Sequence, residues 1–152
     1  MNFSIDTSSL IDWYKYYPKD VFASLWGMFT EACDNSVLVA HEYVLEELSR
    51  RDNDLLQWVK DRNNFILPLD EEVQRTATRI IGKYSLNKAS HSSKIVADPF
   101  VISLAIRHDL VVVTEEKPGT KENPKIPFIC KGENVACVNI VGFMRRMGWK
   151  FI

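Results

Sequence analysis

Short apolar runs recur along the chain, and segments with helical spacing separate them. The runs lie at residues 3–5, 37–40, 110–113 and 135–138, with a brief further one at 65–67. Runs of this length are typical of strands that are buried on both faces of a parallel sheet. Strands that alternate with helices indicate βαβ units, whose helices cover both faces of the sheet. The pattern therefore predicts an α/β fold with a mainly parallel central sheet.

The helical segments complete this expectation. Two helices are predicted after the first strand, one from Asp6 through Tyr14 and one from about Pro18 to Cys33, with Val21 on the apolar face of the second. Further helices are predicted at residues 41–51, 54–62, 70–84, 98–108 and 140–147. Residues 115–127, rich in proline and glycine, are predicted to be a loop. Without an internal repeat or a linker, residues 1–152 are expected to form a single domain.

Composition excludes several classes of protein. The chain is 46% hydrophobic and 26% charged, as folded proteins are and disordered ones are not. It has no apolar run long enough to span a bilayer and no signal peptide at its N-terminus, so we expect a cytoplasmic protein without a membrane partner. Cys33, Cys130 and Cys137 lack the spacing of a zinc site or a disulfide framework, and we expect buried free thiols.

The two halves of the chain differ in charge. Residues 1–75 carry 14 acidic and 7 basic side chains, whereas residues 76–152 carry 6 acidic and 12 basic ones. A carboxylate metal site beside a basic surface for a phosphate backbone would use this arrangement. An ordinary solvated surface would produce it as well.

Three acids stand where a parallel sheet would bring them to one edge. Asp6 follows the first strand, Glu116 lies shortly after the strand at 110–113, and Asp98 would open the helix that leads into that strand. Ligands of α/β proteins collect at the carboxyl ends of the strands. Each acid also has an ordinary explanation, because Asp is a common helix N-cap and Glu is common on surfaces.

A fourth acid is expected from the helix after the second strand. Glu46 and Glu47 lie between the core positions Val44 and Leu48, and only one of the two can point along the edge of the sheet. Mg²⁺ and Mn²⁺ prefer carboxylate and water ligands and commonly serve phosphodiester chemistry. The clustered acids therefore favour a Mg²⁺ or Mn²⁺ site.

A basic segment precedes Asp98. Residues 83–94 contain three lysines, one histidine, four serines and no acid. Such a composition suits contact with phosphate oxygens, so Lys83, Lys88 and Lys94 are candidate RNA-binding residues. A solvated connection between two helices is the competing interpretation.

The acidic motifs resemble those of the PIN-domain family. Residues 5–11, 44–48, 97–102 and 113–116 agree with the family's motifs in order and spacing, and the fit covers nearly the whole chain. The tail, residues 125–130 and 148–151, is similar to a bacterial and archaeal PIN-like subgroup whose function is not known. The resemblance implies a three-layer α/β/α sandwich and Mg²⁺- or Mn²⁺-dependent cleavage of single-stranded RNA. It also implies, for many members, a toxin role beside an antitoxin protein, and it raises the expectation of a homodimer.

The resemblance assigns roles residue by residue. Asp6 is the first acid, Glu47 the second because it immediately precedes Leu48, Asp98 the third and Glu116 the fourth. Supporting hydrogen bonds are expected from Thr7, Ser8 and Thr114. The family commonly has Asp at the fourth position, and here Glu116 stands there with Glu115 beside it. The identity of the fourth ligand and the presence of a second metal therefore stay open.

Other functions fit less well. A haloacid-dehalogenase-type phosphatase needs an Asp two residues after the first acid, and position 8 is Ser. A response-regulator-like phosphoacceptor needs paired acids near the first strand and a lysine after the last one, where Asn139 stands. The alternative that stays open is a catalytically inactive PIN-like module that binds RNA or a protein.

Overall fold

The computed structural model describes residues 2–86 and 98–152 and contains a five-stranded sheet of order β3-β2-β1-β4-β5. All neighbouring strands pair in parallel. The strands are β1 (Phe3–Ile5), β2 (Leu38–His41), β3 (Ile66–Leu67), β4 (Val111–Val113) and β5 (Cys137–Val138). The predicted α/β fold with a parallel sheet is confirmed.

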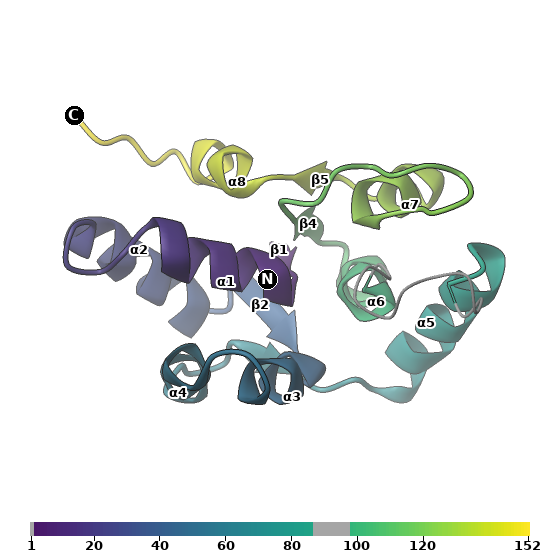
Figure 1. Ribbon diagram of the computed structural model, residues 1–152, viewed down its shortest axis with the longest axis horizontal. Helices are drawn as coiled ribbons and strands as arrows, with labels where there is room; N and C mark the ends of the chain where they lie inside the picture. The colour runs from purple at the N-terminus through teal and green to yellow at the C-terminus, as the bar shows by residue number, and fades with distance from the viewer. Residues whose placement is uncertain (1, 87–97) are drawn as a thin grey trace.

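Helices cover both faces of the sheet and make three layers. Figure 1 shows α1, α2, α4 and α8 on one side, and α5, α6 and α7 on the other. No helix within the described ranges is long and apolar enough to cross a membrane. The helices are α1 (Thr7–Tyr16), α2 (Ala23–Asp34), α3 (Tyr43–Ser49), α4 (Asn53–Lys60), α5 (Glu71–Lys83), α6 (Pro99–His108), α7 (Ile126–Gly132) and α8 (Ile140–Arg146).

The strands are mostly apolar because both faces of the sheet are covered. Leu38 and Ala40 pack into the core beneath α1 and α2, whereas Val39 between them packs into the core beneath α5 and α6. In β4, Val113 packs into the first of these cores and Val112 into the second. Successive side chains of a strand point to opposite faces, so both faces here require apolar residues.

Polar caps fix where many of the helices begin. A side-chain oxygen of the residue before the helix accepts a backbone N–H of the first turn, which satisfies one donor that the helix itself leaves unpaired. The capping residues are Asp6 for α1, Asp52 for α4, Asp70 for α5, Asp98 for α6 and Asn139 for α8.

Helix α2 starts later than the sequence predicts. The backbone N–H groups of Val21 and Phe22 both donate to the carbonyl of Pro18, which makes a turn rather than a helix. Val21 is 68% exposed and does not belong to the apolar face. The prediction of a helix from about Pro18 was therefore wrong for its first turn.

Helix α7 lies partly where a loop was predicted. It begins at Ile126, with Pro127 in its first turn. Proline has no N–H to lose there, and its fixed φ suits the start of a helix. The prediction of a loop over residues 115–127 was therefore wrong for its last two residues.

The prediction of buried free thiols is confirmed in part. All three are free, with Cys33 and Cys130 buried and Cys137 half-buried. Burial raises the pKa of the Cys33 thiol well above its ordinary value, which keeps that thiol neutral.

Candidate active site

The strand register brings three polar residues to one edge of the sheet. Ile5 pairs with Val113, and Ser4 pairs with Val39. The residues that follow in this register, Asp6, His41 and Thr114, therefore lie in neighbouring positions at the carboxyl ends of the strands. The chain passes from β1 to β2 on one side and later returns to β4 on the other. Such a reversal of strand order is where α/β proteins bind ligands.

Asp6 is a buried carboxylate with several donors. Its side chain accepts the Ser9 N–H at 3.0 Å and the Thr114 hydroxyl at 2.9 Å, and the residue is 3% exposed. Burial raises the pKa of Asp6 to about 7, although the hydrogen bonds from Ser9 and Thr114 oppose the rise. The nearby charge of Glu116 raises the pKa further. A cation beside Asp6 would stabilise its charged form.

Asp98 is bound from two sides. One of its oxygens caps α6 by accepting the N–H groups of Phe100 at 2.8 Å and Val101 at 3.3 Å. The other lies 2.6 Å from Nε2 of His41, a residue that is fully buried. Burial is the largest single influence and opposes charge on both partners. Their mutual attraction and hydrogen bond, together with the N–H groups at Asp98 and the charges of Glu47 and Asp6 near His41, outweigh it, so the pKa of Asp98 is lowered and that of His41 is raised.

His41 is a site residue that the sequence analysis missed. It ends β2, whereas the sequence analysis placed it at the start of a helix. Its Nδ1 atom is buried and has no hydrogen-bond partner among the residues that the structure describes. The available signal was its position directly after the apolar run at residues 37–40, at the same edge of the sheet as Asp6.

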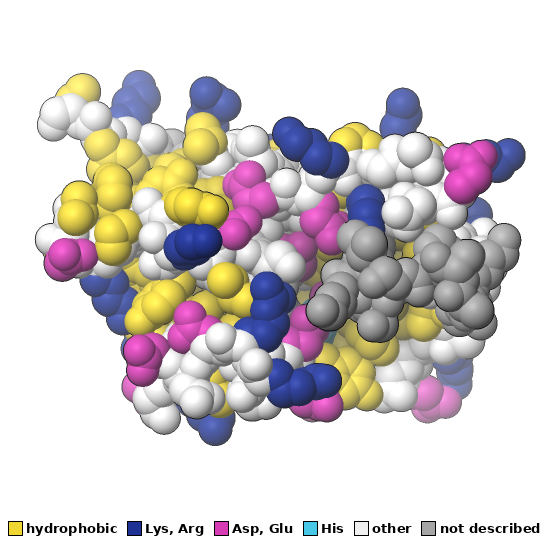
Figure 2. Space-filling model, in the orientation of Figure 1, with side chains coloured by type: hydrophobic (Ala, Val, Ile, Leu, Met, Phe, Trp, Pro, Cys, Tyr) yellow, Lys and Arg dark blue, Asp and Glu magenta, His cyan; other side chains and the backbone are white. Residues whose placement is uncertain are grey.

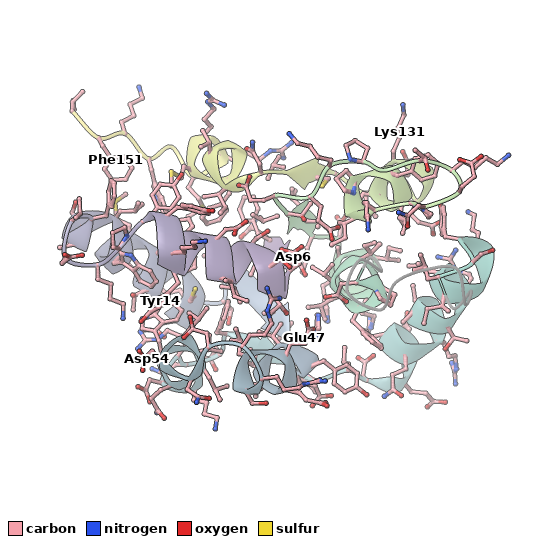
Figure 3. The ribbon with its side chains drawn as sticks, viewed as in Figure 1. Asp6, Tyr14, Glu47, Asp54, Lys131 and Phe151 are labelled. Atoms are coloured by element: carbon pink, nitrogen blue, oxygen red, sulfur yellow. The ribbon has the colours of Figure 1, made fainter. Side chains whose placement is uncertain are left out.

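Glu47 faces the acids and Glu46 does not. Ligand atoms of His41, Glu47 and Asp98 lie within 4.8 Å of one another, which is close enough to share a metal ion. Burial raises the pKa of Glu47, and the charge of Asp98 raises it further. Glu46 is solvent-exposed and pairs with Arg50 at 3.2 Å. Figure 3 shows Glu47 on α3 close to Asp6 at the start of α1.

The side chains of Glu115 and Glu116 accept hydrogen bonds from different helices. Glu115 accepts the N–H of Ile140 at 2.8 Å, at the start of α8. Glu116 accepts the N–H of Ile126 at 3.1 Å, at the start of α7. Burial raises the pKa of Glu116, and the charge of Asp98 adds to the rise. Glu116 is therefore the member of the pair that interacts with both Asp98 and Asp6.

The supporting hydroxyl groups differ in part from expectation. Thr114 links two acids, because its hydroxyl donates to Asp6 and accepts the Glu116 N–H at 3.1 Å. Ser8 is exposed, and the support for Asp6 expected from Thr7 or Ser8 comes instead from Ser9. The buried Thr7 hydroxyl approaches Glu47 closely enough to lower its pKa but does not reach hydrogen-bond geometry.

The predicted RNA-binding lysines are only partly described. Lys83 pairs with Glu133 at 2.8 Å near the end of α7, so its charge is directed at this carboxylate. Lys88 and Lys94 lie outside the described residues. A basic residue near the acids is Arg51, an exposed side chain whose charge lowers the pKa values of Glu47 and Asp12. Figure 2 shows acidic side chains across the middle of this face with lysine and arginine side chains around them.

Three solved structures share the fold. VapBC2 from Rickettsia felis, determined with a DNA fragment from its promoter, has a TM-score of 0.58 and 14% identity over 91% of this chain and 98% of that one. FitAB bound to an IR36 DNA fragment has a TM-score of 0.53 and 18% identity over 90% and 94%. FitAcB from Neisseria gonorrhoeae has a TM-score of 0.50 and 19% identity over 90% and 96%. These likenesses confirm the PIN-like α/β fold.

Comparison with family models identifies the family of this chain. No curated protein sequence matches the chain. A family model described as "Domain of unknown function (DUF4411)" matches residues 3–151, which is nearly the whole length. The chain therefore belongs to the DUF4411 family, and its fold is that of a PIN domain.

Proposed function

We propose that this protein is a metal-dependent ribonuclease that cleaves single-stranded RNA at a Mg²⁺ or Mn²⁺ site. The observation that supports the proposal is that ligand atoms of His41, Glu47 and Asp98 lie within 4.8 Å of one another, with Asp6 acting on His41 and Asp98 on Glu116 through their charges. Asp6 comes from the end of β1, Glu47 from α3, Asp98 from the start of α6 and Glu116 from the segment after β4. They are near enough for their charges to act on one another.

The donor set suits such an ion. Burial raises the pKa values of Asp6, Glu47 and Glu116, so three carboxylates are held where their negative charges are costly. A bound cation would offset that cost, and oxygen donors match the preference of Mg²⁺ and Mn²⁺. In the proposed site Asp6, Glu47 and Asp98 hold the ion.

The protein's own groups would position the reaction. When bound, the metal would activate water for attack on the phosphorus and stabilise charge on the phosphate. Ser9 and Thr114 hold the Asp6 carboxylate, and His41 holds that of Asp98. Glu116, whose carboxylate accepts the Ile126 N–H, would assist a second ion or orient the attacking water.

A toxin role is the finer part of the proposal. It follows the PIN-domain resemblance and the likeness to VapBC2 and FitAB, and it brings with it an antitoxin protein as partner and a homodimer. A neighbouring gene for a small DNA-binding protein that co-purifies with this chain would support it. Purification of the chain alone from its host, as a monomer, would count against both partners.

The direct test is cleavage of a labelled single-stranded RNA by the purified chain. We expect cleavage with Mn²⁺ or Mg²⁺ and none in excess EDTA. Binding of RNA without cleavage and without any response to metal would instead support the catalytically inactive binding module.

The first acidic pair gives a matched comparison. Glu47→Gln is expected to lower the cleavage rate by at least about 100-fold, because it removes a charged ligand, whereas Glu46→Gln is expected to cost far less activity. Both substitutions lie on one helix and keep the side-chain size. Initial rates under identical metal concentrations measure the difference. The reverse order would place Glu46, not Glu47, at the metal.

The second acidic pair separates stability from activity. Glu115 and Glu116 each accept one helix N–H, so each Gln substitution should cost a similar amount of stability, about 1 kcal/mol or less. Only Glu116→Gln should slow cleavage strongly, by roughly 10- to 100-fold. Urea unfolding and cleavage rates together test this. Equal activity of the two variants would remove Glu116 from the site.

A further inference from the structure

A pocket opens directly beside the proposed metal site. Its volume is about 310 Å³, at the lower end of the range for sites that hold small organic groups. Glu47 and Asp98 form part of its wall, so a group in the pocket lies next to two of the acids. The other lining residues are Tyr43, Glu46, Arg50, Pro99 and Phe100.

Two aromatic rings from different helices line this pocket. Tyr43 at the start of α3 and Phe100 at the start of α6 have ring centroids 4.9 Å apart, at an interplanar angle of 62°. Phe100 is anchored, because it packs against the core beneath α5 and α6 and lies 5.7 Å from the buried ring of His41. Tyr43 remains 45% exposed. A large exposed aromatic held by a fixed neighbour is suited to stacking on a planar ligand.

The remaining wall is polar. Glu46 and Arg50 are both mostly exposed and pair at 3.2 Å, so they offer a carboxylate acceptor and guanidinium donors beside the rings. A purely apolar ligand would make no use of these groups. A ligand with a flat face and a polar edge would use both parts of the wall.

We propose that this pocket binds an unpaired nucleobase of the RNA next to the scissile phosphate, stacked on the exposed ring of Tyr43, with the inclined ring of Phe100 against the edge of the base. The proposal rests on the proposed ribonuclease function and deepens it, because it names what selects the substrate. Bases of a double helix are stacked on one another and cannot enter such a pocket, whereas those of a single strand can. Stacking on an aromatic side chain contributes about 1–3 kcal/mol per base and accepts every base.

The test measures affinity rather than cleavage. A labelled single-stranded RNA of about 12 nucleotides is titrated with the full chain in EDTA, beside its duplex and a strand of the same length made of abasic nucleotides. The variant Tyr43→Leu removes the exposed ring, and Tyr43→Phe retains it. Tyr16→Leu is the matched control, because Tyr16 is 62% exposed at the far end of α1 and is not part of the pocket.

We expect the single strand to bind more tightly than the duplex or the abasic strand. Tyr43→Leu should weaken binding of the single strand about 10-fold and leave the abasic strand unaffected, because only stacking is lost. Tyr43→Phe and Tyr16→Leu should stay within about twofold of the parent chain. Phe100→Leu, checked for folding by thermal unfolding, should weaken binding in the same direction.

Two results would overturn the pocket assignment. One is unchanged affinity of Tyr43→Leu for the single strand, which would show that no base of the RNA stacks in the pocket. The other is equal weakening for the single strand and the abasic strand. A different result would contradict the ribonuclease proposal. In that case the parent chain would cut no RNA in the presence of Mn²⁺, whatever the effect of Tyr43→Leu on binding.

Discussion

Replacing Asp6 with Asn is expected to lower the rate of RNA cleavage by about 1,000-fold or more while α1 stays folded. Asp6 lies at the end of β1, where its charge interacts with those of Glu116 and His41, and His41 in turn binds Asp98. Removing one member of a group that acts as a unit commonly costs orders of magnitude in rate. Asn is as good an N-cap as Asp, so the N–H of Ser9 keeps its acceptor.

The same substitution is expected to stabilise the metal-free protein at alkaline pH. Burial raises the pKa of Asp6 from 3.8 to about 7, so between these values the folded chain retains a proton that the unfolded chain has released. The contribution of this retained proton to the free energy of unfolding is fully present below about pH 4 and is lost as the pH rises to about 7. Above that pH a buried charge opposes folding, and Asn carries none.

Urea unfolding in EDTA at pH 8 measures this effect. Asp6→Asn should raise the free energy of unfolding by on the order of 2 kcal/mol, and the gain should disappear near pH 4. Asp20→Asn, at an exposed position, should change neither activity nor stability. An inactive variant that is also less stable at pH 8 would point to a structural role for Asp6. Activity within about tenfold of the parent would remove Asp6 from the site.

The sequence was sufficient to predict the sheet and the edge at which the acids meet. Strands such as β2 and β4 carry apolar residues for two cores, and this produces an apolar run in the sequence such as residues 37–40. Asp6 and Asp98 could be placed because Asp6 follows the first strand and Asp98 opens the helix that leads into β4, which puts both at the carboxyl edge of the sheet. The structure shows that each also caps a helix. Leu48 and Val44 marked the core face of α3, which helped to choose Glu47 over Glu46.

Features that depend on contacts distant in the sequence could not be predicted. The partner of His41 is Asp98, 57 residues away, and only the packing of α6 against β2 brings them together. Glu115 and Glu116 lie in a loop without any periodicity, and each is oriented by the N–H of a helix that begins well beyond it. The role of Lys88 as an RNA contact and the single-domain organisation of the chain stay predictions.

The affinity for Mn²⁺ is expected to rise steeply with pH up to about pH 7 and to level off above it. An ion can bind Asp6 only after that carboxyl loses its proton, and burial raises the pKa of Asp6 to about 7. Glu47 and Glu116 also have raised pKa values and add to the slope. The pKa of Asp98 is lowered, so this residue is already charged and contributes little.

Calorimetric titration with Mn²⁺ at several pH values between 5.5 and 8 measures the slope. One proton released per ion bound corresponds to about a tenfold gain in affinity per pH unit below pH 7. Titrations in two buffers of different ionisation enthalpy count the released protons independently. In Asp6→Asn the affinity should be low and its pH dependence shallower, because the group that releases the proton is gone. If the parent chain bound Mn²⁺ equally well at pH 5.5 and pH 8, the ion would be held by carboxylates that are already charged, and Asp6 would not be among its ligands.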